Sequence, residues 1–426
     1  MSNESPPEAP RDERFGGRGG TGGSGERGSD GWTETGTAGR REGVDGGACA
    51  GVVLVTVDSL RADVVGRECS PTIQGLADRG TVFENAFAHG NWTPFSCFQV
   101  AKSVLGRSRE VAFEEDDRPL VDTSNLIDAE DRALSFVDRI DGPFFLWIHY
   151  MDPHIPYVPA PRYVRAEMDS PVGSLRMLRA HLSAGLGTAL SDGRLDDLRA
   201  LYRSAVRQTD DSIGRVLEAL RARGLRDRTC VVVAGDHGEE FGEHGNLAHY
   251  PKLYEELLHV PLIVDYPDGE SRSISRAVGL DSIPPTVCEA LSVPTSVRFD
   301  GTSLLDVVRD GRTPPREPVV SLTVRGDQIT QQPIPRRLSE GETLVSARTA
   351  EWTYVHHEDS GRRELYHRPG DPTEQRNVWD EAGDVEAVAP LRRAVRRHLR
   401  RIGGDDEPRG EPPADVSSRL RALGYQ

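Results

Sequence analysis

Acidic residues and histidines crowd into one glycine-rich stretch, residues 235–245, with the sequence Gly-Asp-His-Gly-Glu-Glu-Phe-Gly-Glu-His-Gly. Asp and His together supply oxygen and nitrogen ligands for a divalent cation. The glycines permit a tight backbone, which lets neighbouring side chains converge. The stretch follows a run of β-branched residues that is typical of a buried strand, and Asp58 follows a second such run. A polar loop with ordinary histidines is the plainer interpretation, but the two matching positions favour a metal site.

A further histidine, His154, lies in the sequence Asp152-Pro153-His154-Ile155-Pro156, again just after a run typical of a buried strand. The prolines restrict the backbone on both sides, so the imidazole is held in place. Such a group could donate a hydrogen bond to a substrate oxyanion or a proton to a leaving group. The residue types alone leave open whether His154 is catalytic or an ordinary loop histidine.

Alternating strands and helices must position these side chains. Strands are predicted over 51–57, 144–150, 229–235 and 260–264, and helical patterns cover 71–79, the residues after Asp128, and 201–223. This alternation predicts an α/β fold with a mostly parallel sheet flanked by helices. Ligands bind such sheets at the carboxyl ends of the strands, where Asp58 and Asp236 both lie.

From about residue 314 the chain changes character. Residues 319–324, 343–348 and 352–355 are typical of antiparallel strands, and a helix with an arginine-rich face is predicted over 388–402. The arginines could form a basic docking face, but a solvated helix that pairs with acidic neighbours is the favoured interpretation. We therefore expect three parts. They are a disordered Gly-rich tail over 1–48, a catalytic α/β domain over 49–313 with a shortened middle segment, and a small C-terminal α+β subdomain over 314–426.

The composition limits the classes of partner. The chain has 426 residues, and 52 Lys and Arg stand against 68 Asp and Glu, which gives a formal net charge of −16. This acidity argues against nucleic-acid binding. The sequence has no apolar run long enough to predict an integral membrane segment, and no apolar stretch follows the Arg40-Arg41 pair as a signal peptide would require. The five cysteines are dispersed without a disulfide or zinc-finger spacing, so we expect a cytoplasmic protein.

The cationic residues are almost all arginine. Lys102 and Lys252 are the two lysines, so 50 of the 52 basic residues are Arg. Together with the acid excess, this favours adaptation to high salt, where the Debye length shrinks to about 3 Å and self-repulsion is screened. GC-rich codon usage would explain the arginines but not the excess of acidic residues.

The order and spacing of several segments resemble the sulfatase branch of the alkaline phosphatase superfamily, of a salt-adapted, haloarchaeal type. These segments are 55–63, 70–86, 149–157, 236–245, 253–264 and 364–377, and the resemblance covers about residues 51–380. It implies an alkaline-phosphatase-like fold and one divalent metal ion, which could be calcium, manganese or zinc. It also implies a sulfate or phosphate ester as substrate, either a small molecule or one linked to a glycan or a lipid.

The resemblance also implies roles for single residues. Asp58, Asp236 and His237 match the metal-ligand positions, and Thr93 matches the position of the nucleophile. His154 would be catalytic. Threonine cannot be oxidised to formylglycine, so no formylglycine is expected and the hydroxyl itself would attack once a metal lowers its pKa.

Other positions are more ambiguous. His249 and Lys252 compete for a late cationic contact with the substrate, and His244 could donate to the substrate or support another ligand. Ser59 stands where the family often has a second aspartate, and Cys97 stands where it has an arginine. A mixed set of Asp, His and Thr then suits manganese or zinc as well as calcium.

One departure concerns the middle of the chain. Only 154 − 93 = 61 positions separate Thr93 from His154, and residues 112–131 are largely acidic and polar. We expect the sheet to lack a strand here and the site to lack the Lys/His pair that faces the substrate in the family.

We therefore predict a metal-dependent sulfatase-like hydrolase or transferase that cleaves a sulfate or phosphate ester through Thr93. The alternative is a degenerate protein of the same fold that binds a ligand or partner without turnover. The sequence leaves the substrate, the metal and the oligomeric state open.

Overall fold

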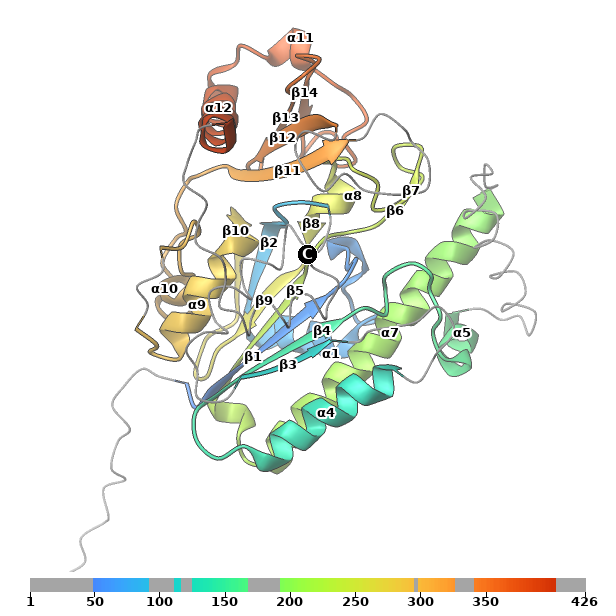
Figure 1. Ribbon diagram of the computed structural model, residues 1–426, viewed down its shortest axis with the longest axis vertical. Coiled ribbons are helices and arrows are strands. Elements are labelled where there is room, and N and C mark those ends of the chain that lie inside the picture. The colour runs from blue at the N-terminus through green and yellow to red at the C-terminus, as the bar shows by residue number, and fades with distance from the viewer. Residues whose placement is uncertain are drawn as a thin grey trace, which may run out of the picture. The chain divides into compact units, whose positions relative to one another are not determined.

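The computed structural model describes residues 49–91, 111–115, 125–167, 192–294, 298–325 and 341–403. Within these residues, eight strands form one sheet in the order β10-β2-β9-β5-β1-β4-β3, with β8 paired to β2 (Figure 1). The strands are β1 (Gly51–Val57), β2 (Thr81–Phe87), β3 (Val111–Glu115), β4 (Phe144–Tyr150), β5 (Thr229–Gly235), β8 (His259–Val260), β9 (Leu262–Asp265) and β10 (Arg272–Gly279). The pairs β1–β4, β1–β5, β3–β4 and β2–β10 are parallel, whereas β9 is antiparallel to β2 and β5. The predicted α/β fold with a mostly parallel sheet is confirmed.

The three central strands are buried along their whole length. Every residue of β1, β4 and β5 is buried, as expected for parallel strands that helices cover on both faces. The register pairs Val57 with both Tyr150 and Gly235. The three strands therefore end level with one another, and the residues that follow them meet at one edge of the sheet.

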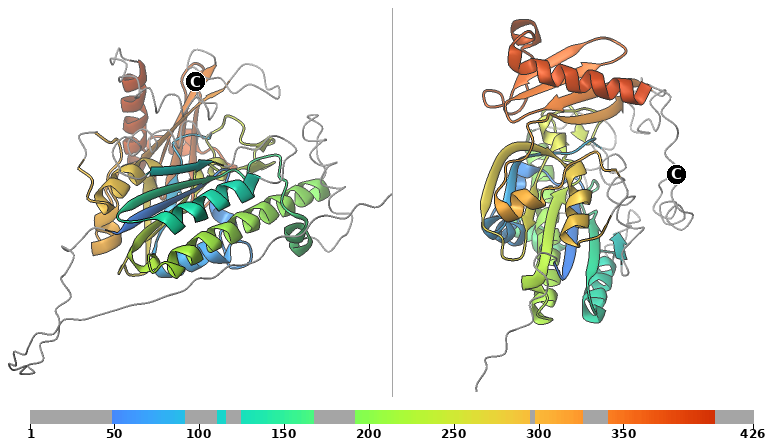
Figure 2. Two further views of the ribbon diagram at one scale, coloured as in Figure 1. Left: turned by 60° about the horizontal axis from the view of Figure 1, so that its bottom comes forward. Right: turned by 90° about the vertical axis from the view of Figure 1, so that its left-hand side faces the viewer.

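Helices cover both faces of this sheet (Figure 2). The side chains of Val53, Val55 and Val57 pack in one apolar cluster with residues of α1 (Pro71–Arg79), α4 (Asn125–Arg139) and α7 (Asp192–Ala222). The alternate residues Val52 and Leu54 pack in a second cluster with residues of α9 (Ile283–Ala290) and α10 (Leu305–Asp310). This alternation is the period of two that a strand imposes.

The C-terminal part forms a separate four-stranded antiparallel sheet, in agreement with the prediction. Its strands are β11 (Val319–Arg325), β12 (Glu342–Arg348), β13 (Trp352–His357) and β14 (Arg363–His367). Helix α12 (Ala389–Gly403) buries Leu391 and Val395 against this sheet. The described chain also has the short helices α5 (Pro161–Glu167), α8 (Glu255–Leu258) and α11 (Trp379–Ala382) and a two-stranded sheet of β6 (Glu240–Phe241) and β7 (Leu247–Ala248).

The structure differs from the sequence-based elements in three places. Strand β3 lies at the sheet edge within the segment where we expected a strand to be missing. The predicted strand 260–264 is divided at Pro261 into β8 and β9, because proline cannot donate a hydrogen bond to a ladder. Helix α7 begins at Asp192, well before the predicted start at 201.

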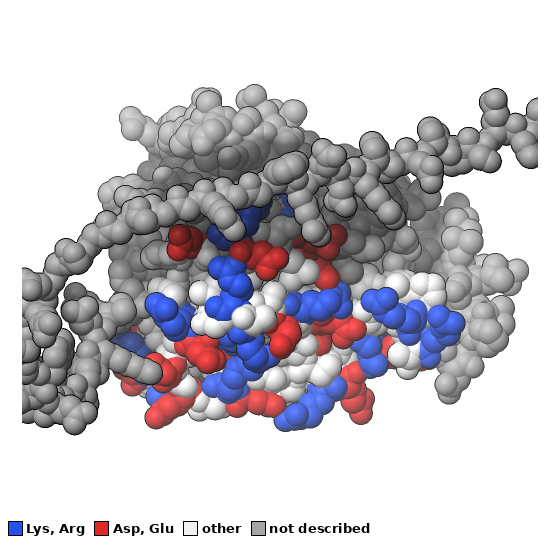
Figure 3. All heavy atoms as spheres, turned by 90° about the horizontal axis from the view of Figure 1, so that it is seen from below, with Lys and Arg blue, Asp and Glu red and all other residues white. Residues whose placement is uncertain are grey.

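Basic and acidic side chains are interspersed on the face of the molecule that Figure 3 shows. Exposed ion pairs of the described chain include Arg67 with Asp78 and Arg221 with Glu218. Among the described residues, none of the helices has the length and apolar character that crossing a bilayer requires.

Candidate functional site

The carboxyl ends of β1 and β5 bring the predicted metal ligands together. Asp58 directly follows β1, and Asp236 and His237 directly follow β5. The Nε2 atom of His237 lies 3.5 Å from Asp58 Oδ1 and 3.8 Å from Asp236 Oδ2. All three side chains are essentially fully buried. Two carboxylates and an imidazole so close together in the interior form a donor set for a cation.

Hydrogen bonds from neighbouring residues fix the orientation of both carboxylates. The amide groups of Ser59 and His237 donate to Asp236 Oδ1 at 3.1 and 2.7 Å, which leaves Oδ2 as the oxygen nearest to the His237 ring. The hydroxyl of Ser59 donates to Asp58 Oδ1 at 2.9 Å. Ser59 itself has a φ of 59°, a strained backbone conformation that is typical of functional sites.

Glycine is required at two positions because neighbouring backbone approaches closely. A Cβ atom at Gly238 would lie 1.9 Å from the carbonyl oxygen of Glu256, and one at Gly235 would lie 2.4 Å from that of Leu60. No side chain tolerates such distances. The glycines of the 235–245 stretch therefore let the chain turn directly beneath the site.

The tautomer of His237 follows from its neighbour. Its Nδ1 atom lies 2.8 Å from the carbonyl oxygen of Gly238, and because a carbonyl only accepts, Nδ1 carries the proton. In the neutral ring Nε2 then has its lone pair facing the two aspartates, and it has no hydrogen-bond partner among the described residues. Metal-binding histidines are typically held in this way. Burial lowers the pKa of His237, but Asp236 and Asp58 outweigh this effect and raise it.

A second histidine at this point, His149, is one that the sequence reasoning missed. It is the penultimate residue of β4, and its Nε2 atom lies 3.9 Å from Asp58 Oδ2. Ligand atoms of Asp58, His149 and Asp236 all lie within 4.8 Å of one another. The available signal was its pairing with Thr56 on the neighbouring strand β1. Asp58 lies two positions after Thr56 in the sequence.

Two further histidines extend the site away from the aspartates. The ring centroids of His237 and His249 are 4.8 Å apart, and those of His249 and His154 are also 4.8 Å apart. Burial alone would raise the pKa of Asp58. The positive fields of His154, His237, His149 and His249 more than offset that burial, and they hold its pKa well below the ordinary value. The structure therefore brings His154 and His249 together with the three predicted metal ligands.

Glu239 is another residue of this region to which sequence reasoning assigned no role. Its side chain is fully buried, and its Oε2 atom lies 3.6 Å from Nδ1 of His249. The phenol of Tyr157 lies beside it, and burial together with the charge of Glu239 raises the pKa of Tyr157 well above its usual value. The Glu239 carboxylate is therefore within ion-pair distance of the His249 ring.

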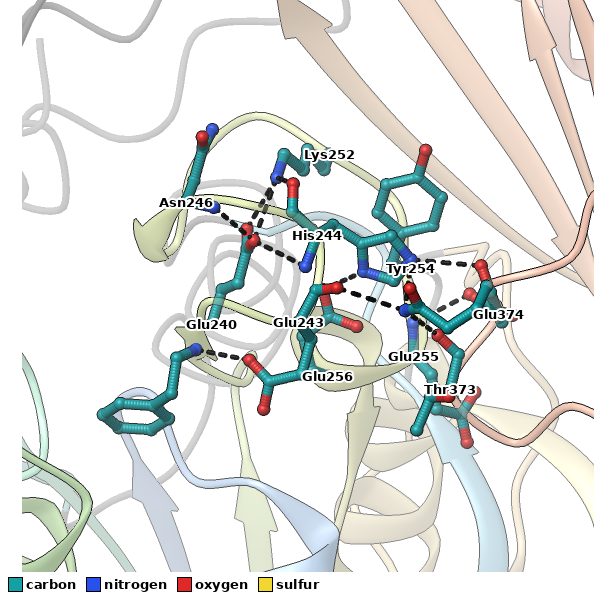
Figure 4. Close-up of polar contacts among 12 residues, drawn as sticks. Glu240, Glu243, His244, Asn246, Lys252, Tyr254, Glu255, Glu256, Thr373 and Glu374 are labelled. Carbon is teal, nitrogen blue, oxygen red and sulfur yellow. Dashed lines mark hydrogen bonds and ion pairs between the residues drawn. The ribbon is translucent and has the colours of Figure 1, made fainter. Parts of the chain in front are cut away.

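The other two predicted substrate contacts lie in a separate network (Figure 4). The Nζ atom of Lys252 lies 2.9 Å from Glu240 Oε2 and donates to the carbonyl oxygen of His244 at 2.7 Å. The ring of His244 contacts Glu256 through Nδ1 at 2.7 Å and the carbonyl oxygen of Glu374 through Nε2 at 3.1 Å. Both cationic groups are therefore engaged by acceptors of the protein itself.

The predicted nucleophile Thr93 and the nearby Cys97 lie outside the described residues. Asn91, two positions before Thr93 in the sequence, is fully buried. Its Nδ2 atom donates to the backbone carbonyl oxygens of His249 and Tyr250 at 2.9 and 2.7 Å. Asn91 is therefore fixed beside His249.

Comparisons with known proteins show similarity to sulfatases. The sulfatase family model matches residues 121–293. The multifunctional alkaline phosphatase superfamily protein PehA of Trinickia caryophylli is 28% identical over 212 residues, which cover 43% of this chain and 41% of that protein. The chain thus spans less than two thirds of the length of the first curated relatives that it matches.

Solved structures agree on the fold. One similar structure, solved with its substrate D-glucosamine-2-N,6-O-disulfate, has a TM-score of 0.67 at 15% identity and covers 85% of this chain and 100% of its own. The phosphonate monoester hydrolase of Agrobacterium radiobacter has a TM-score of 0.63 at 17% identity, with 83% of this chain and 95% of its own covered. The fold is alkaline-phosphatase-like. Residues 121–293 of the chain match the sulfatase family of the alkaline phosphatase superfamily.

Enzymes of this family generally use a divalent metal, and the residues present here fit one. The buried Nε2 atoms of His149 and His237 have no hydrogen-bond partner among the described residues, and both face Asp58. A buried imidazole nitrogen without a partner is costly, and a cation would remove that cost.

Proposed function

We propose that this protein is a metal-dependent hydrolase that cleaves a sulfate or phosphate ester. The observation that carries the proposal is the buried group of Asp58, Asp236 and His237 at the level carboxyl ends of β1 and β5. The match to the sulfatase family model supports hydrolysis of an ester of this kind. When bound there, a divalent cation supplies positive charge against the anionic ester and lowers the pKa of a hydroxyl nucleophile.

In this proposal the hydroxyl of Thr93 is the nucleophile. Its oxygen forms a bond to sulfur or phosphorus while the bond to the leaving oxygen breaks. Water then hydrolyses the threonyl ester and regenerates the hydroxyl. Asn91 supports this role because it anchors the chain two residues earlier against the backbone of His249.

His154 is proposed as the proton donor to the leaving oxygen. Its Nδ1 atom lies 2.5 Å from the carbonyl oxygen of Ile155, so Nδ1 donates there and Nε2 is the atom that remains for a substrate. His249, whose ring lies 4.8 Å from that of His154, is proposed to bind the non-bridging oxygens. We favour His249 over Lys252 for this contact because the ammonium group of Lys252 is paired with Glu240.

The experiment is turnover of 4-nitrophenyl sulfate, 4-nitrophenyl phosphate, bis(4-nitrophenyl) phosphate and a phenylphosphonate monoester, each with calcium, manganese or zinc restored to metal-free protein. We expect turnover of at least one ester, and the fastest one names the class. Thr93→Ala should lower kcat by roughly 10³-fold or more, and Thr93→Ser should retain part of the activity. Equal rates for Thr93→Ala and the natural protein would refute the nucleophile. A metal-loaded protein that turns over none of the esters would support the alternative, binding without turnover.

A further inference from the structure

We infer that His149 is a fourth protein ligand of the metal, and that the site is built for a zinc-like transition-metal ion and not for calcium. The inference rests on the proposed function in placing a cation between Asp58, Asp236 and His237. It adds a residue to that set and names the class of ion. The argument uses the surroundings of His149, the spacing of the donor atoms and the supply of oxygen ligands.

The surroundings of His149 leave one ring nitrogen for a ligand. The side chain is almost completely buried, and its Nε2 atom faces Asp58 Oδ2 at 3.9 Å without a hydrogen-bond partner among the described residues. The other nitrogen, Nδ1, lies 2.8 Å from the hydroxyl oxygen of Thr56. An imidazole with one engaged nitrogen and one that points at a carboxylate is typical of a metal ligand.

Trp147 holds in place the Thr56 hydroxyl that contacts His149. Its indole Nε1 atom is only a donor, and it donates to the Thr56 hydroxyl oxygen at 2.9 Å. That oxygen has two lone pairs, so it can accept from both Trp147 and Nδ1 of His149. With the proton on Nδ1, the lone pair of Nε2 faces Asp58. Thr56 and Trp147, both on the central strands, thus act as the supporting groups that orient His149.

The spacing of the donor atoms matches a small ion. The three distances that join the imidazole nitrogens to the carboxylate oxygens are 3.5, 3.8 and 3.9 Å. A tetrahedral zinc site with bonds of roughly 2.0–2.2 Å has donor atoms about 3.3–3.6 Å apart. Ligand atoms of Asp58, His149 and Asp236 lie within 4.8 Å of one another, so such an ion would draw the set together by up to about an ångström.

Calcium would need more oxygen ligands than the two carboxylates of this group. Calcium takes about six to eight oxygen ligands. The hydroxyl of Ser59 donates to Asp58 Oδ1, and its carbonyl oxygen accepts from Tyr202 at 2.7 Å. Among the described residues, the group with ligand atoms within 4.8 Å of one another holds two carboxylates and an imidazole. Imidazole nitrogens favour zinc and its neighbours in the first transition row over calcium.

The first test measures metal identity in the natural protein. Metal-free protein is equilibrated with an equimolar mixture of calcium, manganese and zinc, freed of excess ions, and analysed by inductively coupled plasma mass spectrometry. We expect about one transition-metal ion per chain and less than a tenth as much calcium. The cobalt(II) form should show the intense visible absorption of a four-coordinate site. Calcium at stoichiometric occupancy, or the weak spectrum of six-coordinate cobalt, would overturn the inference without any variant.

The second test assigns the ligand. His149→Ala should weaken zinc binding by about 100-fold or more and change the cobalt spectrum, since loss of a supporting group alone typically costs 10–100-fold. His149→Asp should raise calcium affinity relative to zinc. His367→Ala, which removes an exposed histidine of β14, is the matched control and should change neither. Natural zinc affinity and an unchanged cobalt spectrum in a folded His149→Ala protein would refute the role of His149.

The two proposals fail in distinguishable ways. Zinc bound through His149 in a protein that cleaves none of the esters would leave the ligand assignment in place and remove the proposed function. Calcium-supported turnover that is unaffected by His149→Ala would do the reverse. Circular dichroism of each variant shows whether a loss of metal reflects a loss of fold.

Discussion

Two clusters of acidic and basic side chains both draw residues from the stretch 235–245, and they differ in how their polar atoms are satisfied. In the network of Figure 4, the ammonium of Lys252 and both ring nitrogens of His244 contact acceptors of the protein. Around Asp58, the Nε2 atoms of His149 and His237 have no hydrogen-bond partner among the described residues. Both clusters are largely buried, so burial alone does not separate them.

The difference indicates which cluster holds the chain and which holds a ligand. A buried polar group is costly unless it has a partner, so a cluster that satisfies itself can stabilise a fold without help. A cluster that leaves buried ring nitrogens without a partner is costly, and a bound cation would remove that cost. We therefore expect the network around Lys252 to control stability, and the group around Asp58 to control metal binding and turnover.

The largest effect should come from Asp236→Asn. The amide oxygen of Asn can still accept from the Ser59 and His237 amides, so the local fold is kept while the negative charge is removed. We expect metal content to fall below a tenth of the natural level and kcat/KM to fall by about 10³-fold. Natural protein should also gain roughly 2.7 kcal/mol of stability at a metal concentration 100 times Kd, and the variant should not. Thermal unfolding with and without metal measures this, and an equal gain in both proteins would contradict the assignment.

The next effect concerns the link between the C-terminal subdomain and the loop that carries the network. Arg348 is fully buried and contacts Glu374 Oε2 at 2.9 Å and the carbonyl oxygen of Leu253 at 2.6 Å. Because Arg348→Met leaves a buried carboxylate without its cation, we expect a loss of about 3–5 kcal/mol in urea unfolding. The matched control is Arg376→Met, whose pair with Glu381 is exposed, and it should cost about 1 kcal/mol or less. Equal costs would show that burial does not set the strength of these pairs.

A crossed pair of variants tests the comparison directly. Lys252→Met removes the cation beside the buried Glu240 and should cost about 2 kcal/mol of stability while metal affinity is kept. His249→Asn should lower kcat/KM by roughly 10²-fold while stability changes by less than about 0.5 kcal/mol. Urea unfolding gives the stability of each variant, and steady-state kinetics gives its kcat/KM. A tenfold or larger loss of kcat/KM in Lys252→Met, with metal bound, would show that Lys252 and not His249 makes the contact with the substrate.

How much of the structure the sequence predicts depends on how far apart two contacting residues lie along the chain. The central strands and helix α1 follow from local patterns, and Asp58 and Asp236 follow from the rule that ligands bind where parallel strands end. His149 was missed because it lies inside an apolar strand, and its role depends on a register with β1 across 93 positions. The network around His244 could not be predicted either, because Glu374 is 130 positions away.

Strand β3 was missed for a different reason. Its sequence, Val-Ala-Phe-Glu-Glu, lies in an acidic segment that predicts a loop. It forms a parallel edge strand because β4 offers it a ladder of backbone groups, which is a tertiary effect that local propensity does not contain.

The smallest effect is a pH dependence that belongs to the self-satisfied part of the molecule. Burial would raise the pKa of Glu364, but hydrogen bonds from His357 and Tyr366 and the charge of Arg362 outweigh it and lower the pKa to about 2. Because the pKa is lowered by folding, the stabilisation is complete above the unfolded value of about 4.5 and is lost as the pH falls towards 2. Linkage with these two values gives about 2 kcal/mol between pH 7 and pH 3. Urea unfolding at both pH values should show this loss in the natural protein and a smaller one in Glu364→Gln. An equal loss in the two proteins would show that other carboxylates carry the acid sensitivity.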